Sequence, residues 1–191
     1  MTVLSNKQVD QARECFGSSI DFSRVRIKAS PFVSDSRPWT CGNVIRVNKT
    51  LPDGTPSIET SSLIHELCHV WQHQQGQPVF LTAAALQLIA MIFRRFDPYD
   101  YGGLVGLARR RRLSDFLPES QAQIVAEYWK SQHGHRYDRL QNRFSKEYVQ
   151  NLHRFVQETR IGWAGAGRAS KIRQIDSIVC LIVNLVLGFF E

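Results

Sequence analysis

The chain has 191 residues, a length that allows one well-packed domain. An apolar share of 43% and a charged share of 21% are ordinary for a folded globular protein and exclude a disordered or collagenous chain. The net charge of +7 favours acidic partners, and the densest basic run lies at residues 109–112. No aromatic residue interrupts that run, so we interpret it as a solvated loop and do not expect nucleic-acid binding.

The four cysteines, Cys15, Cys41, Cys68 and Cys180, are scattered along the chain without a CxxC pair. They are too few for a disulfide scaffold of this size, which favours synthesis in the cytoplasm. The first residues, MTVLSNKQVD, lack the basic and apolar regions of a signal peptide. Classical secretion is therefore not expected.

The first predicted elements are one helix and two short strands. Ser5 and Gln8 have the spacing of a capping box, and Gly17 stands where a glycine ends a helix. Residues 25–29 and 43–48 alternate apolar and polar side chains, as half-buried strands do. These strands are expected to form a small sheet.

Helices dominate the rest of the chain. A turn at residues 52–56 leads into a predicted helix over residues 61–75, which Gly76 closes. Apolar periodicity predicts further helices over residues 82–95, 118–130 and 145–159. The sequence therefore predicts an α+β fold that is mostly helical.

Two stretches, residues 80–93 and 178–190, are apolar almost all the way round. Each is shorter than the roughly 20 residues of a membrane-spanning helix, and each carries an amide, Gln87 or Asn184. Buried core helices are the preferred interpretation, with membrane contact or docking to a partner as the alternative. The second stretch follows a basic, glycine-rich segment, so a separate membrane anchor is a further interpretation of the tail.

The motif HELCH at residues 65–69 carries the chemistry. Residues four apart lie on one face of a helix, so His65 and His69 can bind one metal ion while Glu66 faces its open coordination position. Zinc lowers the pKa of its bound water to about 7, and an adjacent carboxylate can accept the proton. The motif therefore predicts Zn²⁺ as cofactor, two histidine ligands and Glu66 as the catalytic base.

Two apolar strips flank this motif on the same predicted helix. They consist of Leu63, Leu67 and Val70 and of Ile64, Cys68 and Trp71. Such strips predict a half-buried helix that lines a cleft. The alternative is a surface helix with two unrelated histidines, but the motif, its apolar neighbours and the helix end all favour the metal site.

The third zinc ligand has to come from another part of the chain. Gln72 and Gln75 stand where a metzincin has its glycine and third histidine. A downstream carboxylate is the natural choice, and both Glu119 and Glu127 lie in the predicted helix over residues 118–130. Glu119 is preferred because it shares a helix face with small residues that allow close approach, although an exposed surface carboxylate is its alternative interpretation.

Other residues are weaker predictions for the site. His73 continues the ligand face and could orient a ligand, although an exposed histidine is the simpler interpretation. A closed structural zinc site, in which Cys68 or His73 replaces the water, is disfavoured because Cys68 points off the ligand face. A hydrogen bond to the developing oxyanion could come from His133, His135, Tyr128, Tyr99 or Tyr101.

The sequence resembles the zincin-like metallopeptidase domains associated with bacterial type VI secretion spike proteins of the VgrG type and with Rhs-like toxins. The resemblance covers residues 5–140, and its most specific part is HELCHVWQ. The matching stretches are residues 16–27, 40–47, 63–76, 99–103 and 113–129.

This resemblance implies a zincin fold in which a downstream glutamate, here Glu119, is the third ligand. It also implies a toxin or effector that cleaves a protein or peptide and is delivered by a secretion system into a target cell. The expected partners are a secretion spike protein and a cognate immunity protein. Zincins bind peptide along a sheet edge, and residues 43–48 are the predicted edge strand.

The predicted organisation is a zincin-like core over residues 1–140 and a helical extension with the apolar tail over residues 141–191, packed on the same domain. Zinc-dependent peptide hydrolysis is the preferred function. The alternative is a non-catalytic or membrane-active binding module on a zincin scaffold, with membrane contact through residues 178–190. Replacement of Glu66 separates the two, because only the peptidase needs a base.

Overall fold

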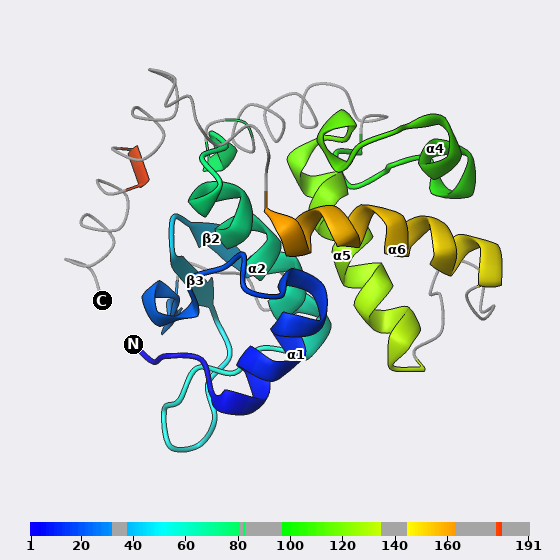
Figure 1. The fold of residues 1–191 in the computed structure, drawn as a ribbon. Coiled ribbons are helices and arrows are strands. Elements are labelled where there is room, and N and C mark those ends of the chain that lie inside the picture. The colour runs from blue at the N-terminus through cyan, green and yellow to red at the C-terminus, as the bar shows by residue number, and fades with distance from the viewer. Residues whose placement is uncertain (32–37, 81, 83–96, 135–144, 163–178, 181–191) are drawn as a thin grey trace.

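The structure is a computed structural model that describes residues 1–31, 38–80, 82, 97–134, 145–162 and 179–180 (Figure 1). The predicted helix over residues 82–95 lies outside these ranges except for Thr82. The apolar tail lies outside them except for residues 179–180, and so does the predicted domain boundary at residue 140. The predictions for these segments stay predictions.

Three short strands form one sheet in the order β1-β3-β2. The strands are β1 (Arg26–Ala29), β2 (Trp39–Cys41) and β3 (Val44–Val47). β1 runs parallel to β3, and β2 runs antiparallel to it. The alternation of side chains therefore predicted β1 and β3 correctly, whereas β2 is too short for alternation to reveal.

β3 is the central strand of this sheet, so the prediction that residues 43–48 form the edge is wrong. The chain turns at Gly42, whose φ of 65° favours glycine, and this tight turn sets β2 against the outer side of β3. The outer strands of the described sheet are β1 and β2. Because the sequence did not predict β2, it also did not predict that β2 would cover one side of β3 and make β3 central.

Five helices of at least seven residues lie within the described ranges. They are α1 (Asn6–Phe16), α2 (Thr60–Gln74), α4 (Gly103–Arg109), α5 (Pro118–Gln132) and α6 (Lys146–Ile161). There are also two short 3₁₀ turns, η1 (Phe22–Arg24) between α1 and β1 and η2 (Leu113–Asp115) between α4 and α5. α4 was not predicted. An α+β fold that is mostly helical, with a small three-stranded sheet, is confirmed.

Local capping explains where several of these helices begin and end. Ser5 and Gln8 form the predicted capping box of α1, and the Gly17 N–H closes it on the carbonyl of Arg13. The Glu59 side chain caps α2 by accepting a hydrogen bond from the N–H of Ser62. The observed ends of these helices agree with the predicted ends to within one or two residues.

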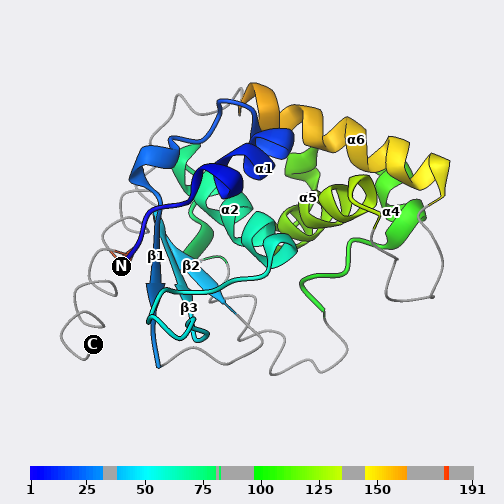
Figure 2. The same ribbon diagram turned by 90° about the horizontal axis from the view of Figure 1, so that it is seen from below.

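α2 is the central element of the molecule, since it contacts β2 and β3 on one side and α5 on the other (Figure 2). α6 packs on α1 and α5, and its Leu152, Phe155 and Val156 belong to the same buried core as Leu67 of α2. No helix in the described residues is long and apolar enough to cross a membrane. The packing thus holds α2 and α5 side by side, which positions the site.

Candidate metal centre and active-site pocket

Three predicted metal ligands meet where α2 crosses α5. His65 and His69 lie one helical turn apart on α2, and Glu119 lies in the first turn of α5. The Glu119 Oε2 atom is 3.4 Å from the His65 Nε2 and 3.3 Å from the His69 Nε2. One donor atom from each residue lies within 4.8 Å of the other two, so the three side chains converge on one point.

These residues fit a tetrahedral divalent metal ion. Two imidazole nitrogens and a carboxylate oxygen are a donor set of catalytic zinc sites. In a tetrahedron with metal–ligand bonds of about 2.05 Å, neighbouring ligand atoms are about 3.3 Å apart. Both measured distances to Glu119 match that spacing.

Gln72 fixes the tautomer of His69. Its Oε1 atom lies 2.8 Å from the His69 Nδ1, so Nδ1 carries the proton and donates it, which leaves the Nε2 lone pair for a metal. The Gln72 amide in turn donates to the Pro118 carbonyl and to the Gln121 Oε1. A single fully buried side chain on α2 therefore orients a ligand and also joins α2 to the start of α5.

Glu66 is buried beside the ligands and is held by β2. The Thr40 hydroxyl donates a hydrogen bond of 2.7 Å to its Oε2 atom. Burial raises the pKa of Glu66, while the two histidines and the Thr40 hydrogen bond oppose that rise. A carboxylate with this environment is poised to take up a proton, which a general base requires.

The ligands themselves are electrostatically coupled. Burial lowers the pKa of His69, but the adjacent Glu119 carboxylate outweighs it and raises the pKa to about 9. Burial raises the pKa of Glu119, but the charges and hydrogen bonds of His69 and His65 hold it well below its usual range. A metal ion would replace the proton that the pair otherwise shares, so metal binding releases a proton.

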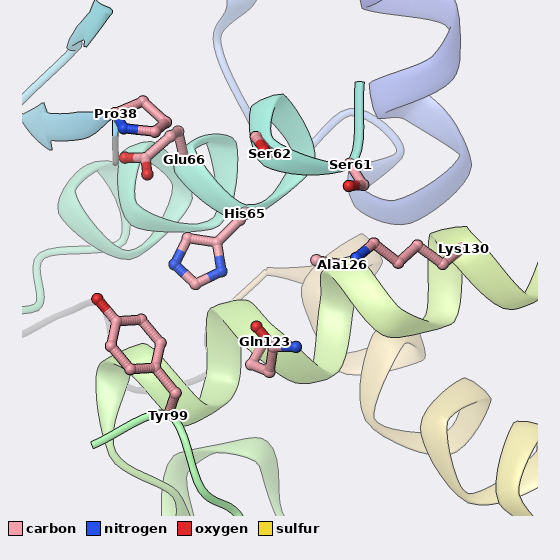
Figure 3. Close-up of a pocket in the computed structure, with 9 residues that line it drawn as sticks. All are labelled: Pro38, Ser61, Ser62, His65, Glu66, Tyr99, Gln123, Ala126 and Lys130. Atoms are coloured by element: carbon pink, nitrogen blue, oxygen red, sulfur yellow. The ribbon is translucent and has the colours of Figure 1, made fainter. Parts of the chain in front are cut away.

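A pocket of about 220 Å³ opens onto His65 and Glu66 (Figure 3). Its walls come from α2, α5, the segment before β2 and the segment before α4. The Tyr99 ring lies next to the His65 ring, with 6.0 Å between the two ring centroids. The remaining lining residues are Pro38, Ser61, Ser62, Gln123, Ala126 and Lys130. A molecule in this pocket would lie directly against Glu66 and against His65, one of the three candidate ligands.

Three other predicted contributors lie away from the pocket lining. The His133 ring stacks on Trp129 and its Nε2 atom lies 2.7 Å from Glu14 at the end of α1. Tyr128 stacks on His153 of α6. His73 faces Gly42 in the turn between β2 and β3. His135 lies outside the described residues.

Tyr101 is also placed outside the pocket, in a buried polar cluster. Its hydroxyl contacts Glu127 and Tyr148, and the Tyr148 hydroxyl donates to Glu127 at 2.7 Å. Burial and the neighbouring carboxylate raise the pKa of Tyr101. Glu127, the rejected ligand, thus lies apart from the metal centre and ties α5 to α6. Tyr101, Tyr128 and His133 therefore pack against neighbouring side chains, although only Tyr128 lies within a helix.

Sequence analysis missed Thr40 and Gln72. Thr40 belongs to the strand that was not predicted, and Gln72 was considered only as the residue that replaces a metzincin glycine. Gln72 does stand three residues after His69, a spacing that lets two side chains on a helix touch. That spacing was the available signal.

The comparisons with known proteins point to one bacterial protein. No protein-family model matches the chain. The type VI secretion system spike protein VgrG2b of Pseudomonas aeruginosa is 32% identical over 142 residues, which is 66% of this chain. The solved effector domain of Pseudomonas aeruginosa VgrG2b has a TM-score of 0.55 and 27% identity, and the match covers 69% of this chain and 74% of that domain.

The chain is homologous to this effector domain. The match spans only 13% of the length of the whole spike protein, so the homology concerns the effector part. It supports the resemblance to VgrG-associated effectors on which the sequence analysis relied.

Proposed function

We propose that this chain is a zinc-dependent peptidase. One observation carries the proposal: His65, His69 and Glu119 converge at the spacing of a tetrahedral metal site, with the buried Glu66 carboxylate beside them on the wall of a pocket. A perturbed carboxylate next to a metal-type donor set in a pocket is the arrangement of metal-assisted hydrolysis.

The residues divide the chemistry among them. When bound, zinc would supply a Lewis acid that polarises the scissile carbonyl and acidifies water. Glu66 accepts the proton of the attacking water and passes it to the leaving amine as the peptide bond breaks. Thr40 stabilises the charged form of Glu66 through its hydrogen bond, and Gln72 holds the His69 tautomer whose Nε2 lone pair would bind the ion.

Tyr99 is our candidate for stabilising the transition state. Of the tyrosine and histidine residues considered for this role and described by the structure, Tyr99 is the one that lines the pocket. Figure 3 shows its hydroxyl on the side of Glu66 and His65. Replacing Tyr99 by Phe is expected to lower kcat roughly 10- to 100-fold, because a donor to developing charge acts mainly in the transition state. Zinc content and KM should change little, and equal losses in kcat and zinc content would contradict this role.

The peptide substrate is proposed to lie along β2 instead of β3. β2 is an outer strand of the described sheet, and its Thr40 contacts the catalytic base directly. An extended peptide that adds to a sheet edge uses backbone hydrogen bonds for affinity and side-chain pockets for specificity. Placement on β2 would bring the scissile bond next to Glu66.

The homology to the VgrG2b effector domain supports the role of an effector of a type VI secretion system. We propose that the chain is delivered with a spike protein into a target cell, where it cleaves a protein or peptide. A cognate immunity protein is the expected partner in the producing cell. Co-purification with the neighbouring gene product would test that partner.

The decisive experiment compares Glu66→Gln with Glu119→Gln. Glu66→Gln should lower peptide cleavage at least about 10³-fold and keep one equivalent of zinc, since Glu66 acts as base and not as ligand. Glu119→Gln should lose both zinc and activity. The exposed Glu147→Gln is the matched control and should retain both. Metal analysis and cleavage of a peptide library measure the outcome.

Toxicity separates the peptidase from a binding module. If Glu66→Gln kills target cells as well as the parent does, peptide cleavage is not the cause of toxicity. The alternative of a non-catalytic or membrane-active module would then be favoured.

A further inference from the structure

The far end of the pocket from Glu66 carries a lysine. Lys130 lies in the last turn of α5 and lines the pocket, and Figure 3 shows its side chain extended towards Ala126 with the Nζ atom beside that residue. The alanine leaves room for the extended lysine side chain. Within the described part of the chain the Lys130 ammonium group makes no hydrogen bond or ion pair. Lys130 is half-buried, and no carboxylate pairs with its ammonium group in the described residues, so this group can bind an anionic ligand.

A hydrogen-bond acceptor lies on the same face of α5. The Gln123 amide nitrogen donates to the Glu127 Oε1 at 2.8 Å, so its oxygen is turned away from Glu127. Figure 3 shows that oxygen directed towards His65. Glu127 is buried and accepts hydrogen bonds from the hydroxyls of Tyr101 and Tyr148, so its own position is fixed. Its hydrogen bond with the Gln123 amide therefore fixes the orientation of that amide.

One nearby carboxylate has to be considered as a competitor for Lys130. Partial burial raises the pKa of Glu59. The hydrogen bonds from Ser61 and Ser62, together with the nearby Lys130 charge, outweigh burial and lower that pKa. Its carboxylate accepts the Ser62 N–H and the Ser61 hydroxyl, so it is committed to the cap of α2. Glu59 therefore screens Lys130 in part without forming an ion pair with it.

We propose that Lys130 and Gln123 form a specificity subsite for an acidic side chain of the bound peptide. Lys130 pairs with the substrate carboxylate, and the Gln123 oxygen accepts a backbone N–H of the same segment. The spacing of seven residues puts both groups on one face of α5. This inference rests on the proposed peptidase function and names its substrate class, a peptide with Asp or Glu close to the cleaved bond.

Binding can be measured without catalysis. The zinc-loaded Glu66→Gln protein is titrated into fluorescent peptides that differ only in Asp or Glu against Asn or Gln, and anisotropy gives Kd. We expect the acidic peptide to bind about 5- to 10-fold more tightly, a preference that weakens at high salt. Adding Lys130→Met should remove the preference, and Lys130→Glu should transfer it to peptides with Lys or Arg. Lys146→Met, an exposed charge loss on α6, is the matched control.

Gln123→Leu supplies a second variant. This variant should weaken the binding of acidic and neutral peptides by the same factor, because Gln123 is proposed to contact the peptide backbone. The preference for acidic peptides should remain. Melting temperatures report whether each variant is folded.

The outcomes separate the subsite from the peptidase. Equal binding of acidic peptide by the Lys130→Met and Lys146→Met proteins overturns the subsite, and so does a lack of binding to either peptide. Cleavage by the parent without acidic preference overturns the subsite and keeps the peptidase. Lys130-dependent binding of acidic peptides that the parent never cleaves keeps the subsite and overturns the peptidase.

Discussion

At the scale of single residues, two uncharged side chains determine how the charged site residues point. Gln72 fixes the tautomer of His69, and Thr40 holds the carboxylate of Glu66. The motif predicts the ligands and the base, but it does not predict these supports, because they come from the next turn of α2 and from the strand β2. Without them the ligand and base side chains would sample several rotamers.

Replacing Thr40 by Val tests the support of the base. The hydrogen bond from Thr40 favours the charged form of Glu66, so its loss should raise the Glu66 pKa further. Glu66 would then be protonated at a higher pH, and the acid limb of the kcat/KM profile should move to higher pH. We expect a loss in kcat of about 5- to 20-fold at neutral pH, measured with full zinc occupancy.

Thr40→Ser is the matched control, because it keeps the hydroxyl and should restore the acid limb. An unchanged acid limb in Thr40→Val would show that Thr40 does not act on the base.

At the scale of the elements, helix signals that depend on neighbouring residues predicted α1, α2, α5 and α6 well. Their caps and apolar stripes are local, so they are visible in the sequence. β2 and α4 were missed because three and seven residues carry too little periodicity. α4 depends instead on a close backbone approach that no pattern shows.

Gly106 makes that approach possible. A Cβ atom at this position would lie 1.7 Å from the Tyr101 carbonyl oxygen, which is backbone and cannot yield easily. Gly106→Ala should therefore lower the free energy of unfolding by about 2–4 kcal/mol, measured by denaturant unfolding.

Gly54→Ala is the matched control for this prediction. Gly54 has a φ of 80° but no atom within 4 Å of its added Cβ, so it tests the backbone conformation alone. We expect a cost of only about 1–2 kcal/mol there. A similar cost at both positions would mean that α4 shifts to make room.

At the scale of the whole molecule, the site exists only because α2 packs between the sheet and α5. This packing brings Glu119 to within 3.4 Å of His65, although the two are 54 residues apart. The same packing joins Thr40 of β2 to Glu66 and Lys130 of α5 to the pocket. The three proposed ligands of one ion thus belong to two helices, so metal binding should stabilise the fold.

Removal of the metal tests that coupling. With free zinc at about 100 times its Kd, the ion should add about 2.7 kcal/mol to the stability of the folded state. For a chain of this size, a chelator should then lower Tm by about 5–10 °C. Scanning calorimetry with and without chelator measures the shift.

The variants give the contrast for that experiment. Glu66→Gln should keep the shift, whereas His69→Ala should abolish it because a ligand is lost. A shift that persists in His69→Ala would place the stabilising ion elsewhere.

The sequence by itself determined the helical ends, the fold class and the motif with its two histidines and glutamate, because each depends on residues within a few positions of one another. It also favoured Glu119 over Glu127, since small neighbours on a helix face allow close approach. The tertiary structure decided which strand is central, which aromatic residues face the pocket and which side chains support the site. These depend on packing between segments far apart in the chain, and periodicity along one segment carries no record of its partner.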